Sequence, residues 1–391
     1  MDILGIETSC DDTGVAVVRF NNRKPFFVVL SNIIASQVEI HKQWGGVYPT
    51  LAKREHQKNL VSVLENALKK AKKLVLFKNK KNIADIGKEK KIKNILSRET
   101  DLRKSLIDFL KKYKKPRIDA IAVTVGPGLE PCLWTGVNFA RALSFYWQIP
   151  LVPVNHIEGH IFANFLSKDF PADFRKIFPA IGLVVSGGHT QLILIKDIGK
   201  YRVLGETRDD AAGECFDKVA RILGLGYPGG PIIAAKAGKF AKNFASELRL
   251  PRPMLNQGNY DFSFSGLKTA VLYNYNRQSK EKRKSKLYVK EMCFEVQQAI
   301  AEVLVKKTIK AARDYLVKSI IVGGGVAANK ELRKKLRRSV KKEISGVALY
   351  APDNKFCTDN AAMIAVAAYF NFRRGEIKDW KKIRAKANLK L

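Results

Sequence analysis

The stretch DILGIETSCDDTGVAVVRF, residues 2–20, decides the fold. Two apolar runs flank a short polar turn, which is the pattern of a β-hairpin. The run KPFFVVL at 24–30 predicts a third strand. Residues 180–205 repeat this order with AIGLVVS, the turn GGHTQ, and then LILIKD and KYRVLG. Hairpins are common, so the repeat alone does not exclude coincidence.

Both three-strand units are followed by helix-rich sequence. Two such units predict an α/β fold that is duplicated into two lobes, with a nucleotide cleft between the lobes. This architecture resembles that of actin, the sugar kinases and the heat-shock ATPases. In those proteins, paired hairpin turns face a bound nucleotide.

A length of 391 residues also favours two domains over one. We expect an N-terminal actin-like lobe over residues 1–155, with a basic helical insertion or hairpin at about 70–117. We expect a C-terminal lobe over 156–372 that carries the metal and nucleotide motifs. A basic tail, expected to be loose, covers 373–391.

The longest helices are predicted from their apolar periodicity. Residues 53–73 have the pattern of an amphipathic helix, and 287–317 have that of one long helix or a helix pair. The alanine-rich stretch 359–369 predicts a buried helix.

The formal charge of +35 is the strongest compositional signal. Between Lys69 and Arg117 there are 19 Lys or Arg against 5 Asp or Glu, so 19 − 5 gives +14 for this stretch. A surface of this kind attracts nucleic-acid phosphates and gives salt-dependent affinity. Lysine-rich helices that serve only solubility are the alternative.

The cysteines and the hydropathy indicate the compartment. The five cysteines are scattered without a CxxC pair, which argues against disulfides and zinc–thiolate sites and favours a reducing cytoplasm. No apolar run reaches the roughly 18 residues of a membrane span. The first residues lack a signal-peptide pattern. We therefore expect a cytoplasmic protein with no membrane partner.

His156 and His160 lie in NHIEGHIFAN. A spacing of four places both imidazoles on one helical face, within reach of one metal ion, although two structural histidines are the alternative. Glu158 follows His156 by two residues, not one, so the HExxH pattern of a metalloprotease is absent. Asp359 in CTDNAAM is the best third ligand, or else a plain helix N-cap.

Several glycine-rich segments follow predicted strands. In VVSGGHTQ, the run Val184, Val185, Ser186, Gly187 and Gly188 lets backbone N–H groups approach an anion, although an ordinary turn would look the same.

Two further segments favour nucleotide binding. Asp217 lies on an apolar-faced helix and needs a partner, for which a ribose hydroxyl pair or a salt bridge is suitable. Gly230 lies in the sharp GYPGGP loop, and Asn329 follows the glycines of VGGGVAANKELR. Neither a Rossmann nor a P-loop pattern is present.

Asp11 and Asp12 occupy the first hairpin turn. In kinase-like proteins of this architecture, a carboxylate in this turn often handles a metal or a nucleophile. The alternative is a turn former, because Asp is common in turns.

The motifs together resemble the tRNA N6-adenosine threonylcarbamoyltransferase family, TsaD or Gcp, in its bacterial form. The motifs that carry the resemblance are GIETSCDDTGVAVV, GGVYPTLAKREH, GPGL, HIEGHIFAN, VVSGGHTQL, RDDAAGECFDKVARILGLGYPGGP, DFSFSGLKTAV, VGGGVAANKELR and CTDNAAM. They cover the chain except for about 70–117 and the last twenty residues.

The resemblance implies an acyltransferase. It would transfer threonylcarbamoyl from threonylcarbamoyl-AMP to N6 of the adenosine 3′ of the anticodon, in tRNAs that read codons beginning with A, and release AMP. For this reaction we expect a catalytic role for Asp11 or Asp12, either to accept the N6 proton or to orient the threonylcarbamoyl group. Substrate-binding positions would be Val184 to Gly188, Asp217, Gly230 and Asn329.

The resemblance also implies a cofactor and partners. One divalent metal per chain, iron(II) favoured over zinc, would bind His156, His160 and Asp359. Val184 stands where archaeal relatives carry a tyrosine ligand. The partners would be tRNA, threonylcarbamoyl-AMP, a paralogous subunit and an ATPase helper of the TsaB and TsaE type.

Two features depart from the family pattern. The charged stretch 70–117 is an unusual insertion, for which extra tRNA contact is a hypothesis. The loop GPGLEPCLWTG at 126–136 lacks the usual small residues after GPGL. A small-molecule kinase and a non-catalytic nucleic-acid-binding scaffold are the rival functions. The paired histidines are not expected in a kinase, and a scaffold predicts that His156→Ala leaves function intact.

Overall fold

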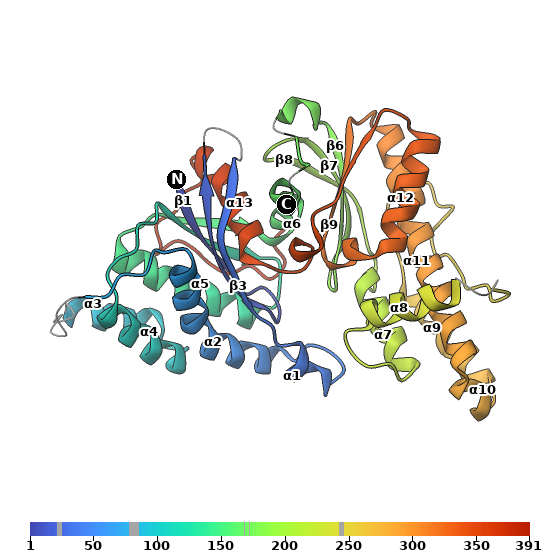
Figure 1. Cartoon of the computed structure of the whole chain (residues 1–391), viewed down its shortest axis with the longest axis horizontal. Coiled ribbons are helices and arrows are strands. Elements are labelled where there is room, and N and C mark those ends of the chain that lie inside the picture. Colours follow the sequence, from blue (N-terminus) through green and yellow to red (C-terminus); the bar gives the residue numbers. More distant parts are fainter. Residues whose placement is uncertain (22–25, 78–85, 168, 172, 242–245) are drawn as a thin grey trace. The chain divides into compact units, whose positions relative to one another are not determined.

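The computed structural model describes residues 1–21, 26–77, 86–167, 169–171, 173–241 and 246–391. The chain forms two compact units, each with its own mixed sheet (Figure 1). Unit 1 comprises Met1–Glu39, Val47–Lys168 and Asp359–Leu391. Unit 2 comprises Ile40–Gly46 and Asp169–Thr358.

The sheet of unit 1 has the order β3-β2-β1-β4-β5. β1 pairs antiparallel with β2 and β2 with β3, while β4 is parallel to both β1 and β5. The strands are β1 (Asp2–Glu7), β2 (Thr13–Phe20), β3 (Phe27–Ala35), β4 (Ala120–Gly126) and β5 (Leu151–Asn155).

The sheet of unit 2 has the order β10-β9-β6-β7-β8, which is the same topology with β6 in the place of β1. The predicted duplication and the α/β fold class are therefore confirmed. The strands are β6 (Ala180–Val185), β7 (Thr190–Asp197), β8 (Lys200–Glu206), β9 (Ser319–Gly323) and β10 (Ala348–Tyr350).

Helices cover both faces of the first sheet because β1 is apolar on both faces. Leu4 and Ile6 point into a core shared with α2 (Pro49–Lys70) and α5 (Glu130–Trp147). Gly5 faces the other way, toward α13 (Ala361–Arg373). A Cβ atom on Gly5 would lie 2.2 Å from the carbonyl oxygen of Ala361, so only glycine permits this approach.

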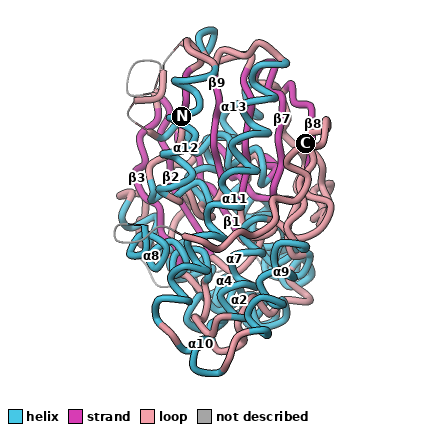
Figure 2. The backbone as a smooth tube through the Cα atoms, turned by 90° about the vertical axis from the view of Figure 1, so that its right-hand side faces the viewer, coloured by secondary structure: helices cyan, strands magenta, loops and turns pink. Residues whose placement is uncertain are grey.

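The core of unit 2 lies between its sheet and several helices. Ile181, Leu183 and Val185 of β6 share one apolar cluster with α7 (Ala212–Ile222) and α11 (Lys286–Asp314). Figure 2 distinguishes the helices, strands and loops of the same backbone. The predicted region 287–317 is one long helix, α11, and not a helix pair.

The remaining helices are shorter. They are α1 (Val38–Lys42), α3 (Ile86–Ile95), α4 (Thr100–Lys112), α6 (His156–Phe162), α8 (Gly229–Ala241), α9 (Ser265–Arg277), α10 (Lys280–Lys284) and α12 (Lys330–Glu343), with 3₁₀ turns η1 (Ala163–Leu166), η2 (Phe174–Lys176), η3 (Gly325–Ala328) and η4 (Asn354–Phe356). None of the helices in the described ranges has the length and apolar character needed to cross a bilayer.

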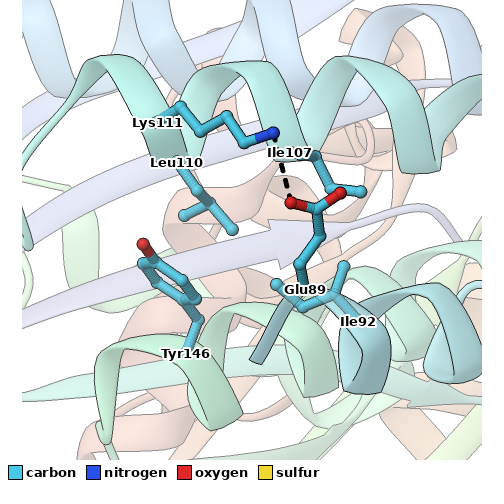
Figure 3. Close-up of a pocket in the computed structure, with 6 residues that line it drawn as sticks. All are labelled: Glu89, Ile92, Ile107, Leu110, Lys111 and Tyr146. Atoms are coloured by element: carbon cyan, nitrogen blue, oxygen red, sulfur yellow. Dashed lines mark ion pairs between the residues drawn. The ribbon is translucent and has the colours of Figure 1, made fainter. Parts of the chain in front are cut away.

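The described part of the 70–117 insertion contains α3 and α4 and packs into unit 1. Residues 78–85 lie outside the described part of the chain. Leu102 and Leu106 of α4 are fully buried in the same core as α2 and α5. Between α3, α4 and α5 lies a hollow of about 10 Å³, rimmed by the Glu89–Lys111 ion pair of 3.1 Å (Figure 3). It holds one water molecule at most, so it is not a ligand pocket.

The compact units divide the chain elsewhere than at the lobe boundary we expected. The helices α6 and α13, expected in a C-terminal lobe over 156–372, belong to unit 1, because α13 packs against β1, β2 and α6. The basic tail is also held there. Ile383 is buried, the Lys386 N–H donates to the Val125 carbonyl at 2.7 Å, and the Gly128 N–H donates to Ala387 at 3.0 Å.

Candidate metal centre and glycine-rich loops

Strand β5 leads directly into α6, and this junction positions both histidines. The Asn155 side chain caps α6 by accepting the Ile157 N–H at 2.9 Å. His156 and His160 then lie one helical turn apart, with ring centroids separated by 4.6 Å. Both rings are buried, so the one-face prediction from their spacing is confirmed.

Asp359 completes the group from the segment before α13. Its Oδ1 atom lies 3.6 Å from His156 Nε2 and 3.3 Å from His160 Nε2. The three donor atoms all lie within 4.8 Å of one another. The helix cap is Asn360 instead, whose Oδ1 accepts the Met363 N–H at 3.0 Å. The alternative that Asp359 is a plain N-cap is therefore excluded.

The chemistry of this group fits a metal ion. His160 is fully buried, and neither of its ring nitrogens forms a hydrogen bond to any residue that the structure describes. A buried polar atom without a partner is unfavourable, and a cation beside the carboxylate would supply one. Two imidazoles and one carboxylate form a ligand set typical of iron(II) and of zinc.

The two histidines differ in their electrostatics. Burial lowers the pKa of His156, but the charges of Asp359 and Glu7 outweigh it and raise that pKa to about 9. Burial and the charge of His156 lower the pKa of His160. His156 is thus the more basic of the two imidazoles, whereas His160 favours the neutral form that binds metals.

Glu7 at the end of β1 also belongs to this group, although no motif in the sequence singled it out. Its Oε2 lies 3.2 Å from His156 Nδ1 and accepts the Thr124 hydroxyl at 2.7 Å, while its Oε1 accepts the Ser9 N–H at 2.6 Å. The sequence does contain a signal for such a role, because Glu7 ends the otherwise apolar run GIE. A carboxylate buried in this way needs a partner.

The turn with Asp11 and Asp12 belongs to the same unit. His56 of α2 holds it through its Nδ1, 2.7 Å from the Thr13 hydroxyl, and its Nε2, 2.9 Å from the Cys10 carbonyl. Burial, the neighbouring Asp11 charge and Asp359 raise the pKa of Asp12 to about 7, against a hydrogen bond to Ser36 that lowers it.

Glu158 points away from this group. Its Oε2 accepts from Asn371 Nδ2 at 3.1 Å and its Oε1 from Arg374 at 3.4 Å. It is therefore engaged with α13 and the residue after it, which agrees with the rejection of a metalloprotease.

The predicted substrate positions lie in unit 2. Val184 and Val185 are the buried last residues of β6, and Ser186 begins the turn. The Ser186 N–H donates to the His189 carbonyl at 2.8 Å. A Cβ atom added at Gly187 or Gly188 would meet nothing within 4 Å, so one side of this turn is open.

Two other glycines bring their segments against this turn. A Cβ atom on Gly213, at the start of α7, would lie 2.5 Å from the Ser186 carbonyl oxygen. At Gly324 after β9, where φ is +90°, it would lie 2.2 Å from the Val185 carbonyl oxygen. The loops of the second hairpin, α7 and β9 therefore converge at the end of β6.

Asp217 contacts the start of α8, one residue before Gly230. Asp217 Oδ1 accepts the Gly229 N–H at 2.7 Å, and Gly230 is the next residue of that helix. Asp217 thus has a backbone partner at the start of α8.

Asn329 is the N-cap of α12. Its Oδ1 accepts from the Glu331 and Leu332 N–H groups at 3.0 and 3.1 Å, and its Nδ2 donates to Gln297 at 2.9 Å. The side chain therefore fixes the end of the loop after β9.

Comparisons with known proteins agree with this arrangement. The family model described as TsaD, tRNA N6-adenosine threonylcarbamoyltransferase, matches residues 28–76 and 103–366. The curated protein of that name from Syntrophomonas wolfei is 45% identical over 371 residues, covering 95% of this chain and 92% of the relative. The one from Bacillus subtilis is 42% identical over 375 residues, covering 96% and 92%.

Solved structures support the fold. Full-length HypF, crystallised in a phosphate- and nucleotide-bound form, matches 97% of this chain and 47% of its own, with a TM-score of 0.51 and 12% identity. At this identity, the likeness concerns the fold alone.

Proposed function

Because this chain belongs to the TsaD family and is a tRNA N6-adenosine threonylcarbamoyltransferase, we propose that its two groups of site residues divide the reaction. Residues of unit 2 bind the adenylate donor, and residues of unit 1 act on the reacting acyl group.

The donor is threonylcarbamoyl-AMP, and the acceptor is N6 of the adenosine 3′ of the anticodon in tRNAs that read ANN codons. N6 forms a bond to the carbamoyl carbon, the bond from that carbon to the phosphate oxygen breaks, and AMP leaves with the electron pair. The mixed anhydride is already activated, whereas the N6 lone pair is delocalised into the ring. The protein therefore contributes mainly positioning and charge stabilisation.

The glycine-rich loops hold the AMP part of the donor. The open turn at Gly187 and Gly188 presents backbone N–H groups to the phosphate, as in other anion-binding turns. Asp217 and Gly230 bind the ribose. Asn329 contributes indirectly, because its side chain is used in capping α12 and so holds the loop beside the nucleotide.

Asp12 accepts the proton that leaves N6, and Asp11 raises its basicity. A general base works best when its pKa lies near the working pH, and the pKa of Asp12 is raised to about 7.

A divalent cation held by His156, His160 and Asp359 would polarise a phosphate or carbonyl oxygen as a Lewis acid. Iron(II) is favoured over zinc, because two histidines and one carboxylate are typical of non-haem iron sites. The observation that carries this assignment is the buried His160, which lacks a hydrogen-bond partner among the described residues and faces Asp359.

The test uses the protein, threonylcarbamoyl-AMP, unmodified tRNA and candidate helper subunits, with mass detection of the modified nucleoside. His160→Ala should lose both the bound metal and product formation. His41→Ala is the matched control, because His41 is also fully buried but belongs to unit 2, whereas His156, His160 and Asp359 belong to unit 1. If His160→Ala forms product at the wild-type rate, the metal centre has no role in transfer.

Family membership also supports a paralogous subunit and an ATPase helper as partners, acting with this chain in the cytoplasm. Omitting each helper in turn from the same assay tests this. If the chain alone sustains many turnovers, the helpers are not required.

A further inference from the structure

Glu7 is a buried carboxylate for which the proposed reaction has no direct use. It ends β1 in the interior of unit 1 and is 0% exposed. No lysine or arginine in the described ranges lies within ion-pair distance of it. A buried carboxylate without a cation needs several hydrogen-bond donors to remain charged.

Three donors surround this carboxylate. The Ser9 N–H donates to Oε1 at 2.6 Å, and the Thr124 hydroxyl donates to Oε2 at 2.7 Å. The same Oε2 lies 3.2 Å from His156 Nδ1. The Glu7 carboxyl group already accepts from Ser9 and Thr124, and a proton on His156 Nδ1 would make this third contact a hydrogen bond as well.

The second neighbour of Nδ1 does not settle its protonation. The Ser9 hydroxyl lies 3.2 Å from His156 Nδ1 and is able either to donate or to accept. Glu7 is therefore the group that selects the tautomer of this ring. With Nδ1 bonded to Glu7, Nε2 is the ring nitrogen left to bind a cation beside Asp359, whose Oδ1 lies 3.6 Å away.

We propose that Glu7 is a positioning residue of the transferase, which holds His156 with its proton on Nδ1 so that Nε2 is the ligating atom. This inference rests on the proposed metal centre and deepens it. Carboxylates in this role commonly fix ring orientation and tautomer in metal sites. Glu7 itself is not counted among the ligands, because it contacts His156 at Nδ1, whereas the nitrogen that faces Asp359 is Nε2.

Glutamine has the same shape but cannot satisfy both sides of this site. If its oxygen faces His156 and Thr124, its NH₂ group meets the Ser9 N–H, donor against donor. If the amide is reversed, its NH₂ donates to His156 Nδ1 and forces the proton onto Nε2. The second arrangement removes the ligating lone pair.

The experiment measures Zn²⁺ affinity by competition with a chromophoric chelator and needs no substrate. Glu7→Gln should weaken Zn²⁺ binding by about 10- to 100-fold relative to wild type. Glu99→Gln is the matched control, because Glu99 is a carboxylate of the same unit that is 1% exposed and accepts from Asn138, away from the histidines. It should retain the wild-type affinity.

A second measurement keeps the inference testable if Glu7→Gln does not fold. The ¹⁵N chemical shifts of His156 in Zn²⁺-loaded wild-type protein should show a protonated Nδ1 and a metal-bound Nε2. Metal on Nδ1, or a folded Glu7→Gln with wild-type affinity, would overturn the inference. A wild-type protein that binds no Zn²⁺ or Fe²⁺ would instead remove the metal centre itself.

Discussion

Two neighbouring residues, Asp359 and Asn360, show how function is divided at the scale of single side chains. Both are good N-cap residues, and both precede α13. Asn360 makes the cap bond to Met363, which leaves the Asp359 carboxylate beside the two imidazoles. The neighbouring side chains therefore have separable roles.

Separate substitutions should reveal these roles. Asn360→Ala removes the cap and should lower the free energy of unfolding by about 1 kcal/mol while the protein keeps its metal. Asp359→Asn should release the metal and abolish transfer with a smaller loss of stability. Thermal denaturation and metal analysis by mass spectrometry distinguish them. Equal metal loss in both variants would contradict the division.

Asp12 allows a prediction about pH. Its pKa is raised by burial first and by the Asp11 charge, to about 7. A base must be ionised, so transfer should increase as pH rises through about 7, and Asp12→Asn should lose this dependence together with most activity. Rates measured from pH 5.5 to 8.5 test this, and Asp11→Asn should shift the midpoint to lower pH.

The pH dependence of stability should have the opposite sign to that of the transfer rate. Ionisation of Asp12 should increase the rate and lower the free energy of unfolding. The pKa of Asp12 in the folded state lies above the unfolded value of 3.8, so folding favours the protonated carboxyl group. The stabilisation that this gives is complete below about pH 4 and is lost as pH rises through about 7. Asp12→Asn should therefore be more stable than wild type at pH 8. If Asp12→Asn is less stable than wild type at pH 8, the ionised carboxylate of Asp12 does not destabilise the folded protein.

At the scale of elements, the loop after β9 depends on close backbone contact. Gly324 combines a φ of +90° with a position where a Cβ atom would lie 2.2 Å from the Val185 carbonyl oxygen. Gly346, between α12 and β10, has nearly the same φ of +93° but open space around it. The pair separates the effect of backbone conformation from that of collision.

We expect Gly346→Ala to lower the free energy of unfolding by about 1 kcal/mol, from the left-handed conformation alone. Gly324→Ala should lower it by several kcal/mol and weaken binding of the adenylate, because the loop must move away from β6. Chemical denaturation and titration with AMP measure both effects. Equal costs for the two variants would mean that the close approach is not required.

At the scale of the whole molecule, the formal charge of +35 raises the question of where tRNA binds. Deleting the insertion is not a clean test, because Leu102 and Leu106 belong to the core of unit 1. Reversing exposed charges on α3, on α4 and on the turn between them is a better test of whether the insertion binds tRNA. These charges include Lys90, Arg98 and Lys104.

Reversing these three charges to Glu should weaken tRNA binding and reduce its dependence on salt, if the insertion contacts phosphates. The matched control reverses Lys334, Arg337 and Lys341, which lie exposed on one face of α12. Fluorescence anisotropy at several salt concentrations compares the two. An equal loss in both variants would indicate a long-range effect of net charge and no specific contact by the insertion.

Much of the fold was predictable because its signals are local. The alternation in residues 2–20 and its repeat at 180–205 specify two hairpins, and similar hairpins followed by helices lead to two sheets with the same strand order. Lobe boundaries were less predictable. Which sheet a late helix such as α13 joins depends on a close contact with Gly5, and this contact leaves no periodic signal in the sequence.

By itself, the sequence determined the two sheets and the pairing of His156 with His160, because strand alternation and helical spacing act over a few residues. The tertiary structure alone decided that Asp359 is left beside these rings, that Asn360 and Asn329 serve as caps, and that Glu7 contacts a histidine 149 residues away. Such choices depend on which donors and acceptors meet once the core is packed, and a buried polar group takes whatever partner the packing brings to it.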